Sequence, residues 1–425
     1  MVNVTIPAGQ TKSATTDITP SFTGTGGNGS TSYTEIVFEK LIPVELIDVD
    51  FRGDTTTTLY TLKGEDGTLY LGPHWIDKDA DGNTANTANG ERNYPVAYAG
   101  GSKPKIQATF DLAGLDNTAA QNVKIRATGS DGISFPERPV SIGVANGTWK
   151  YPQTESSTAW NKTVKFYDKD DPAKSFKLNW QIKVGTGQWT NLLTTEHTIY
   201  VTLGQRKTQD NLETLYYLGC KNAAGQTTEA NVRTQIYSEF TDQDVKDIAG
   251  NTLYYYRNGI QGPFSMQANT MLSSPNRNGD CNAWADLFNR LLLLQGIDSN
   301  VVTVTAKNPN TRMIVKNVTF SGSSPYISSS GDVMNLGGDI TVAAGIAGQG
   351  QTVPPKLFSN HCIVKSGNLF YDPSYGTSVT NSEKAYEDST FAGFGKTINN
   401  ANLNSDLEAQ QNNTNASSSS EVNIN

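Results

Sequence analysis

The sequence predicts a multidomain protein in which all-β modules come first and an α+β domain follows. Apolar and polar residues alternate at a period of two through the first half of the chain, as in strands that bury one face. After about residue 205 the apolar spacing becomes helical, and further strands follow the helices. The length of 425 residues exceeds that of one ordinary core and suits two or three domains.

Two β modules are expected in the first half, over residues 1–100 and 101–205. Alternation is clearest over residues 176–184, FKLNWQIKV, and the hairpin turn Gly185-Thr186-Gly187 follows. The abundance of Gly, Thr, Asn and Ser suits many short strands joined by turns. Several short strands with turn signals between them are typical of an immunoglobulin-like sandwich, which we expect for the second module.

An α+β domain is expected over residues 206–396. The best predicted helix covers residues 281–295, where apolar residues form one broad stripe, and Gly296 ends it. Weaker helical spacing covers residues 212–219 and 232–240, and strands are expected at residues 301–304, 313–320, 357–364 and 369–371. Residues 397–425 are rich in Asn, Ser, Gln and Thr without an aromatic residue, which predicts a disordered tail.

Composition excludes several classes of function. The formal net charge of −8 argues against a nucleic-acid partner, because phosphate binding needs clustered Lys and Arg. The densest apolar run, Leu291 to Leu294, is far shorter than the ~20 residues that a membrane span requires. The N-terminal residues have no secretory signal pattern, although the composition is similar to that of extracellular bacterial proteins, so the compartment stays open, as does the oligomeric state.

The three cysteines, Cys220, Cys281 and Cys362, cannot all pair, so at least one thiol is free within the chain. None has the spacing of a zinc site, and the chain has only three His. We therefore expect no cofactor and no metal at these residues. A free cysteine with a distant His is a candidate catalytic pair if the local sequence supports it.

Cys281 stands where a polar segment meets the start of the predicted helix over residues 281–295, with Asn278 or Asp280 as the N-cap. The partial positive charge of a helix N-terminus lowers the pKa of a thiol there. The N–H groups of the first turn can also stabilise an oxyanion. The alternative is a buried cysteine that fills the core. Cys362 is expected to be such a core residue, because strand alternation turns it away from the neighbouring His361.

His361 lies on an apolar strand, and Asp372 ends the next strand just before Pro373. A connection of hairpin length, residues 365–368, joins the two strands. Neighbouring strands can therefore bring the two side chains together, and a carboxylate then selects the tautomer of an imidazole that faces a thiol. The alternative, which each residue taken alone favours, is that His361 is a hydrogen-bonded core histidine and that Asp372 is a turn residue.

These three motifs in this order resemble the transglutaminase-like superfamily. The pattern G-D-C-x-x-x-A-x-L-F at residues 279–288, the N-H step at 360–361 and the D-P step at 372–373 are similar to its motifs, over about residues 206–395. The resemblance implies a papain-like fold and a catalytic triad of Cys281, His361 and Asp372. A looser similarity links residues 70–205 to β-rich modules that precede such domains in bacterial proteins.

The resemblance implies acyl transfer on a protein or peptide substrate. Its members include cross-linking acyltransferases, peptidases, amidases and inactive forms, and we favour a peptidase or amidase over a cross-linker. Met271 and Leu272 stand where the superfamily often has an aromatic residue, so the side-chain oxyanion donor is open, with Gln267 and Asn269 as candidates. The alternative is a non-catalytic binding or structural surface protein in which the β modules carry the function.

An acidic segment, Asp77, Asp79 and Asp81 followed by Gly82, has the spacing of a calcium loop. Ala88 occupies the position at which an EF-hand loop has Glu, and no helical pattern flanks the segment. We favour an acidic surface loop, with a partial calcium site of the β domain as the alternative.

Overall fold

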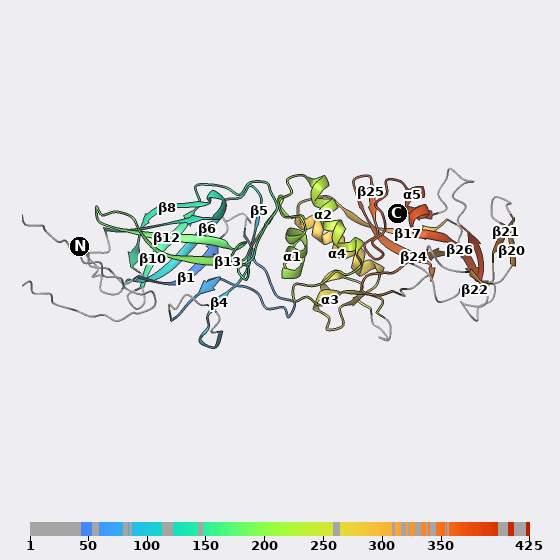
Figure 1. Ribbon diagram of the computed structural model, residues 1–425, viewed down its shortest axis with the longest axis horizontal. Helices are drawn as coiled ribbons and strands as arrows, with labels where there is room; N and C mark the ends of the chain where they lie inside the picture. The colour runs from blue at the N-terminus through green and yellow to red at the C-terminus, as the bar shows by residue number, and fades with distance from the viewer. Residues whose placement is uncertain are drawn as a thin grey trace, which may run out of the picture. The chain divides into compact units, whose positions relative to one another are not determined.

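The computed structural model (Figure 1) describes the greater part of the chain beyond residue 43. All described residues belong to one compact unit that spans residues 42–425. They are residues 44–52, 59–79, 84, 87–112, 122–142, 148–257, 264–307, 311–315, 320–321, 324–327, 333–336, 339–340, 346–352, 354, 357–397, 407–411 and 422–425.

Three sheets make up the described part of residues 44–202. The largest has the order β4 (Arg92–Asn93), β3 (Trp75–Ile76), β1 (Val44–Arg52), β6 (Lys105–Leu112), β10 (Thr148–Glu155) and β9 (Ser141–Ile142). The second has the order β13 (Thr190–His197), β12 (Phe176–Val184), β7 (Val123–Gly129) and β8 (Ser134–Pro139). The third has the order β11 (Lys165–Tyr167), β14 (Ile199–Thr202), β5 (Val96–Ala99) and β2 (Leu59–Tyr60).

The two β modules expected on either side of residue 100 share their sheets. β1 pairs with β6 along eight registered positions, and β5 pairs in parallel with β14. Each pairing joins a strand that precedes residue 100 to one that follows it. We call the described residues between 44 and 202, whose sheets cross the expected boundary at residue 100, the β unit. Pairing partners far apart in sequence leave no local signal at that boundary.

The core of the β unit forms around the strand that the sequence predicts best. Strand β12 coincides with the alternating segment 176–184, and its apolar side chains are buried except that of Val184 at its end. The ring of Trp180 on β12 meets Phe110 of β6 and Tyr151 of β10 edge to face, with ring centroids 5.5 and 5.9 Å apart. Aromatic edge-to-face contacts of this kind hold two sheets together. The β12 and β6 sheets therefore pack face to face as a sandwich.

Five α-helices lie among the described residues after the β unit. They are α1 (Glu213–Lys221), α2 (Glu229–Thr241), α3 (Ala268–Ser273), α4 (Cys281–Leu294) and α5 (Glu383–Thr390). The predicted helices at residues 212–219, 232–240 and 281–295 correspond to α1, α2 and α4. Gly296 follows α4 with a φ of +81°, the left-handed conformation that ends many helices.

Two four-stranded sheets accompany these helices. One has the order β25 (Leu369–Tyr371), β24 (Asn360–Ser366), β17 (Asn300–Ala306) and β28 (Val422–Ile424). The other has the order β23 (Leu357–Phe358), β18 (Thr311–Val315), β26 (Phe391–Thr397) and β27 (Leu407–Gln411). Three short pairs complete the list: β15 (Tyr254–Tyr255) with β16 (Asn278–Gly279), β19 (Phe320–Ser321) with β22 (Asp339–Ile340), and β20 (Ser324–Ile327) with β21 (Val333–Leu336).

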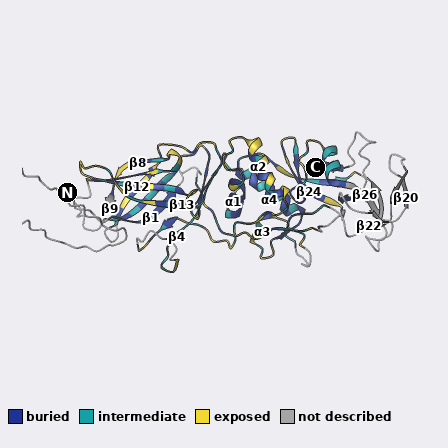
Figure 2. Cartoon of the chain, in the orientation of Figure 1, coloured by how far each residue is buried: buried dark blue, intermediate teal, exposed yellow. Residues whose placement is uncertain are grey.

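Helix α4 is the centre of this half of the chain. It contacts β24 and β17 and also packs against α1, α2 and α3 (Figure 1). Nine of its residues are buried, and these have the dark blue colour of buried residues in Figure 2. A helix that is apolar over most of its circumference is expected at the centre of a packed domain. The start of α4 is thereby held against the strand that carries His361.

Two strands lie within the segment predicted to be disordered, residues 397–425. β27 pairs with β26, and β28 pairs with β17. Asn425 exchanges two backbone hydrogen bonds with Thr303, at 2.8 and 3.0 Å, and Val422 is fully buried. Strand addition uses backbone groups that every residue carries, so a polar composition does not exclude it. No helix in the described part of the chain is long and apolar enough to cross a membrane.

Candidate functional site

Cys281 is the first residue of α4, as the sequence predicts, and Asp280 is the N-cap. The Asp280 side chain accepts a hydrogen bond from the backbone N–H of Ala283 at 3.1 Å. Gly279, the residue before the N-cap, must be glycine, because a Cβ there would lie 2.6 Å from the Met271 sulfur. Cys281 is 5% exposed, so its thiol is buried at the positive end of the helix dipole.

His361 and Asp372 meet, as the hairpin between their strands predicts. His361 lies on β24 and Asp372 follows β25, its antiparallel neighbour. The Nε2 atom of His361 and the Oδ2 atom of Asp372 are 3.0 Å apart, and both side chains are fully buried. A contact of this length between an imidazole and a carboxylate is a charge-assisted hydrogen bond.

Four donors surround the Asp372 carboxylate. Its Oδ2 atom also accepts from the Tyr386 hydroxyl of α5 at 3.0 Å. Its Oδ1 atom accepts from the backbone N–H groups of Ser374 and Tyr375 at 3.2 and 3.4 Å. A buried carboxylate is stable only when it is paired and hydrogen-bonded in this way. Tyr386 had no signal in the sequence, because α5 is short and polar.

The environment of His361 favours the imidazolium. Burial lowers the pKa of His361, but the adjacent Asp372 carboxylate more than offsets this effect, so its pKa is raised. The Nδ1 atom is buried and makes no hydrogen bond to any described residue. With Nε2 facing Asp372, Nδ1 is the nitrogen that can accept a proton from another group.

Cys362 is buried in the core, as strand alternation predicts, but it also belongs to the candidate site. Its thiol donates to the Oδ1 atom of Asn282 at 2.7 Å, and the Cys281 thiol is close enough to shift its pKa. The cause is the packing of α4 on β24, which brings the first turn of the helix onto the face that Cys362 occupies. The candidate site therefore contains two thiols.

The two thiols ionise as a pair. The hydrogen bond from Cys281 lowers the pKa of Cys362 to about 7, although burial opposes this, and the charge of His361 contributes in the same direction. The hydrogen bond to Cys362 and burial raise the pKa of Cys281. The first proton is thus lost easily, and the second is held firmly, as expected when two acids share one site.

The thiol and the imidazole of the predicted triad are near the same tyrosine but are not bonded to each other. The ring centroids of His361 and Tyr375 are 5.6 Å apart. Burial raises the pKa of the Tyr375 phenol, and charges at Asp372 and Cys281 raise it further. Within the described residues, no hydrogen bond joins Cys281 to His361. Such contacts are often long before substrate binds.

The candidate oxyanion donors from the sequence are not supported by their contacts. The Asn269 amide donates to the Asp210 carboxylate at 2.8 Å. Gln267 is the N-cap position of α3 and makes no capping hydrogen bond with its side chain. Tyr256 interacts with the thiols electrostatically: burial raises the pKa of its phenol, and the charge of Cys281 adds to that rise.

In the acidic segment, Asp77 and Asp79 converge with Glu91, and their carboxylate oxygens lie within 4.8 Å of one another. Asp81 lies outside the described residues. Glu91 has no place in the D-x-D-x-D-G spacing, so the sequence could not identify it. This is the group of acidic residues that a cation would meet in the β unit.

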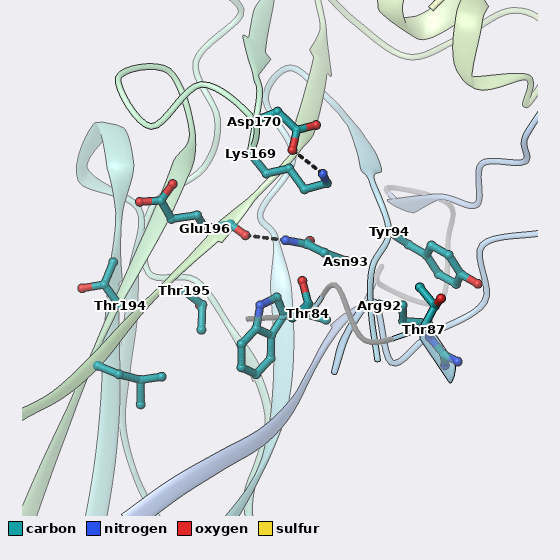
Figure 3. Close-up of a pocket in the computed structure, with 12 residues that line it drawn as sticks. Thr84, Thr87, Arg92, Asn93, Tyr94, Lys169, Asp170, Thr194, Thr195 and Glu196 are labelled. Carbon is teal, nitrogen blue, oxygen red and sulfur yellow. Dashed lines mark hydrogen bonds and ion pairs between the residues drawn. The ribbon is translucent and has the colours of Figure 1, made fainter. Parts of the chain in front are cut away.

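A cavity of about 590 Å³ also opens in the β unit (Figure 3). Its polar lining is partly engaged already: the Asn93 amide donates to the Glu196 carbonyl at 2.8 Å, and Lys169 pairs with Asp170 at 2.6 Å. The lining residues are Trp75, Thr84, Thr87, Arg92, Asn93, Tyr94, Lys169, Asp170, Leu193, Thr194, Thr195 and Glu196.

Comparison with known proteins gives a weak structural similarity. The sequence matches no family model and no curated protein. Among solved structures, the chain is similar to the crystal structure of red sea bream transglutaminase, with a TM-score of 0.30 and 6% sequence identity. The similarity covers 71% of this chain and 48% of that chain, about half of its length. A TM-score of this size does not establish a common fold.

Proposed function

We propose that this chain is a transglutaminase-like thiol enzyme that cleaves or transfers acyl groups of protein amide bonds, with Cys281 as nucleophile, His361 as base and Asp372 as orienting carboxylate. The supporting observation is the buried His361–Asp372 pair, 3.0 Å apart, whose imidazole keeps Nδ1 without a described partner. A thiol at the start of α4 provides the nucleophile that such a base requires.

The reaction begins with the thiolate of Cys281. His361 Nδ1 takes one proton from the thiol pair, the other proton lies on Cys362, and the Cys281 thiolate attacks the carboxamide carbon. A C–S bond forms while the carbonyl π electrons move to oxygen. His361 then gives the proton on Nδ1 to the leaving nitrogen, the C–N bond breaks, and a thioester remains on Cys281. The Asp372 carboxylate stabilises the imidazolium throughout.

The first turn of α4 is the proposed oxyanion site. The Ala283 N–H already donates to Asp280, so the N–H groups of Cys281 and Asn282 are the terminal donors left for the developing charge. Donors fixed by a helix need no reorganisation during the reaction, which is why they stabilise a transition state effectively.

Water is the acceptor that we propose first. Cys281 is only 5% exposed, and water reaches a buried thioester more readily than a lysine side chain does. Deprotonation of water by His361 releases a carboxylic acid and restores the thiol. A primary amine in the same position would give a new amide instead, so both products follow from the same intermediate.

A peptide library incubated with the protein and a labelled primary amine tests both routes at once. We expect new peptide termini or carboxylates, with less label incorporated, and loss of both in Cys281→Ala. Cys220→Ala is the matched control, because Cys220 is fully buried and its thiol donates to the Val201 carbonyl. Equal turnover in wild type and Cys281→Ala would refute the proposal.

A binding protein without catalysis is the second candidate. The cavity of about 590 Å³ in the β unit favours it, since pockets of that size accommodate small ligands. In that case neither product forms, and the labelling of Cys281 does not depend on His361.

A further inference from the structure

We propose that Cys281 and Cys362 are a redox pair that forms a reversible disulfide and thereby closes the thiol site to substrate. The consequence for activity rests on the proposed function, since it assumes that Cys281 is the nucleophile. Formation of the disulfide does not, because it depends only on the two sulfurs and their surroundings.

The fold holds the two sulfurs together from separate elements. Cys281 is the first residue of α4, and Cys362 is the third residue of β24. Packing of α4 on β24 places the Cys362 sulfur 2.7 Å from Asn282 Oδ1, one residue along the helix from Cys281. The two thiols are close enough for each to shift the pKa of the other. Neighbouring thiols of this kind are the starting point for an intramolecular disulfide.

The surroundings hold Cys362 in this position. The Thr303 hydroxyl of the neighbouring strand β17 is hydrogen-bonded to the Cys362 sulfur, with the oxygen and the sulfur 3.9 Å apart. Asn282 in turn donates from its amide to Asp280 Oδ2 at 3.5 Å. Cys362 is only 5% exposed, as is Cys281. Two buried thiols fixed toward each other form an intramolecular bond faster than either meets a second protein.

Covalent bonding fits this pair better than metal binding. A metal site needs at least three ligands in most proteins. Within the described chain, the group of three or more His, Cys, Asp or Glu side chains with converging ligand atoms is the one at Asp77, Asp79 and Glu91, in the β unit. Among the described residues, no third ligand of these types therefore converges with the two sulfurs.

The oxidation balances with a peroxide as oxidant. A thiolate attacks the peroxide oxygen, the O–O bond breaks, and a sulfenic acid and an alkoxide or hydroxide form. The other thiol loses its proton to that base and attacks the sulfenic sulfur, which releases hydroxide and leaves the disulfide. Two electrons pass from the sulfur pair to the peroxide. A dithiol reverses the step by exchange.

The low first pKa of the pair supports this chemistry, because a thiolate is the reactive form near neutral pH. Cys220 offers a contrast within the same chain. Burial raises its pKa to about 12, and its hydrogen-bond partners are the Val201 carbonyl and the Gln295 amide. It should therefore stay reduced under conditions that oxidise the pair.

Hydrogen peroxide followed by peptide mapping without reductant is the direct test. We expect a peptide pair linked through Cys281 and Cys362, with Cys220 unmodified, and full loss of the linkage after dithiothreitol. Phenylarsine oxide should bind the reduced protein once and block both thiols together, as arsenic(III) bridges two neighbouring sulfurs. Over-oxidation of Cys281 without the linkage, in a folded protein, would overturn the proposal.

Cys362→Ser is the diagnostic variant, since a hydroxyl keeps the hydrogen bond to Asn282. Excess peroxide should abolish iodoacetamide labelling of Cys281 in wild type and in this variant, where the sulfenic acid meets no second thiol and is oxidised further to a sulfinic acid that dithiothreitol does not reduce. Dithiothreitol should therefore restore labelling at least tenfold better in wild type. Cys220→Ser is the control and should behave as wild type. Equal recovery in all three proteins would overturn the redox pair. A linked pair in a protein without amide turnover would instead support the pair and refute the proposed function.

Discussion

Asp372→Asn should reverse the tautomer of His361 while the fold is kept. The backbone N–H groups of Ser374 and Tyr375 donate to Oδ1, so the carbonyl oxygen of asparagine must take that position. Its NH₂ group then replaces Oδ2 and donates to His361 Nε2. The imidazole proton is driven to Nδ1, where it prevents the ring from accepting the thiol proton.

The size of the effect follows from the thiol pair. The pKa of Cys362 is lowered from 9.0 to about 7. A pKa lowered by two units gives about 100-fold more thiolate at acidic pH. This factor is the most by which Asp372→Asn could slow labelling of the thiols. The sulfur–sulfur hydrogen bond causes the largest part of the shift, and the charge of His361 a smaller part. We therefore expect labelling of the pair to slow about tenfold.

The assay is iodoacetamide labelling at about pH 6, followed by peptide mapping. Wild type and variant should converge at about pH 10, where the thiol ionises in both. Tyr386→Phe is the matched control, because it removes one hydrogen bond to the same carboxylate without offering a new donor to His361. It should slow labelling less than threefold. Equal rates for wild type and Asp372→Asn at about pH 6, with both folded, would refute the tautomer argument.

Two further predictions concern stability, and both can be measured by urea unfolding. Gly296→Ala should lower the free energy of unfolding by roughly 1–2 kcal/mol, because alanine disfavours the left-handed φ of this position. The loss should be larger still, because the new Cβ would lie 2.6 Å from the Gln205 carbonyl oxygen. An unchanged urea midpoint would contradict the role of Gly296 as the residue that ends α4. Burial lowers the pKa of His197 from 6.5 to about 3, so the folded state keeps it neutral while the unfolded chain gains a proton below about pH 6.5. The stability that comes from keeping His197 neutral is fully present above pH 6.5. The free energy of unfolding should then fall by about 1.4 kcal/mol per pH unit as the pH falls toward 3. His197→Gln should flatten this dependence, and an equal slope in both proteins would show that other groups cause it.

The sequence predicts the thiol helix and the His–Asp hairpin well because both depend on local signals. The apolar stripe of helix α4 and the N-cap at Asp280 can both be recognised in the sequence. His361 and Asp372 are brought together by two neighbouring strands and a short connection, so their contact needs no long-range information. That contact is the part of the candidate site that the sequence anticipates correctly.

Features that depend on distant pairing could not be predicted. One partner of β1 is β6, which begins 53 residues after β1 ends (Arg52 to Lys105). Strand alternation describes one strand, so it could not reveal that α4 covers the face of β24 that carries Cys362. Tyr386 reaches Asp372 from a short polar helix whose sequence has no distinctive period. In each case the information lies in packing between elements, which local periodicity does not record.

The central claim is that Cys281 forms an acyl intermediate, and acid-quenched mass spectrometry tests it most directly. The protein is mixed with an amide substrate from the library, quenched within its turnover time and mapped. We predict a thioester adduct on Cys281, labile to hydroxylamine, which is absent in Cys281→Ala and strongly reduced in His361→Ala, because that variant lacks the acid that protonates the leaving nitrogen. An adduct on Cys362, or none on either thiol while amide bonds are cleaved, would contradict the account.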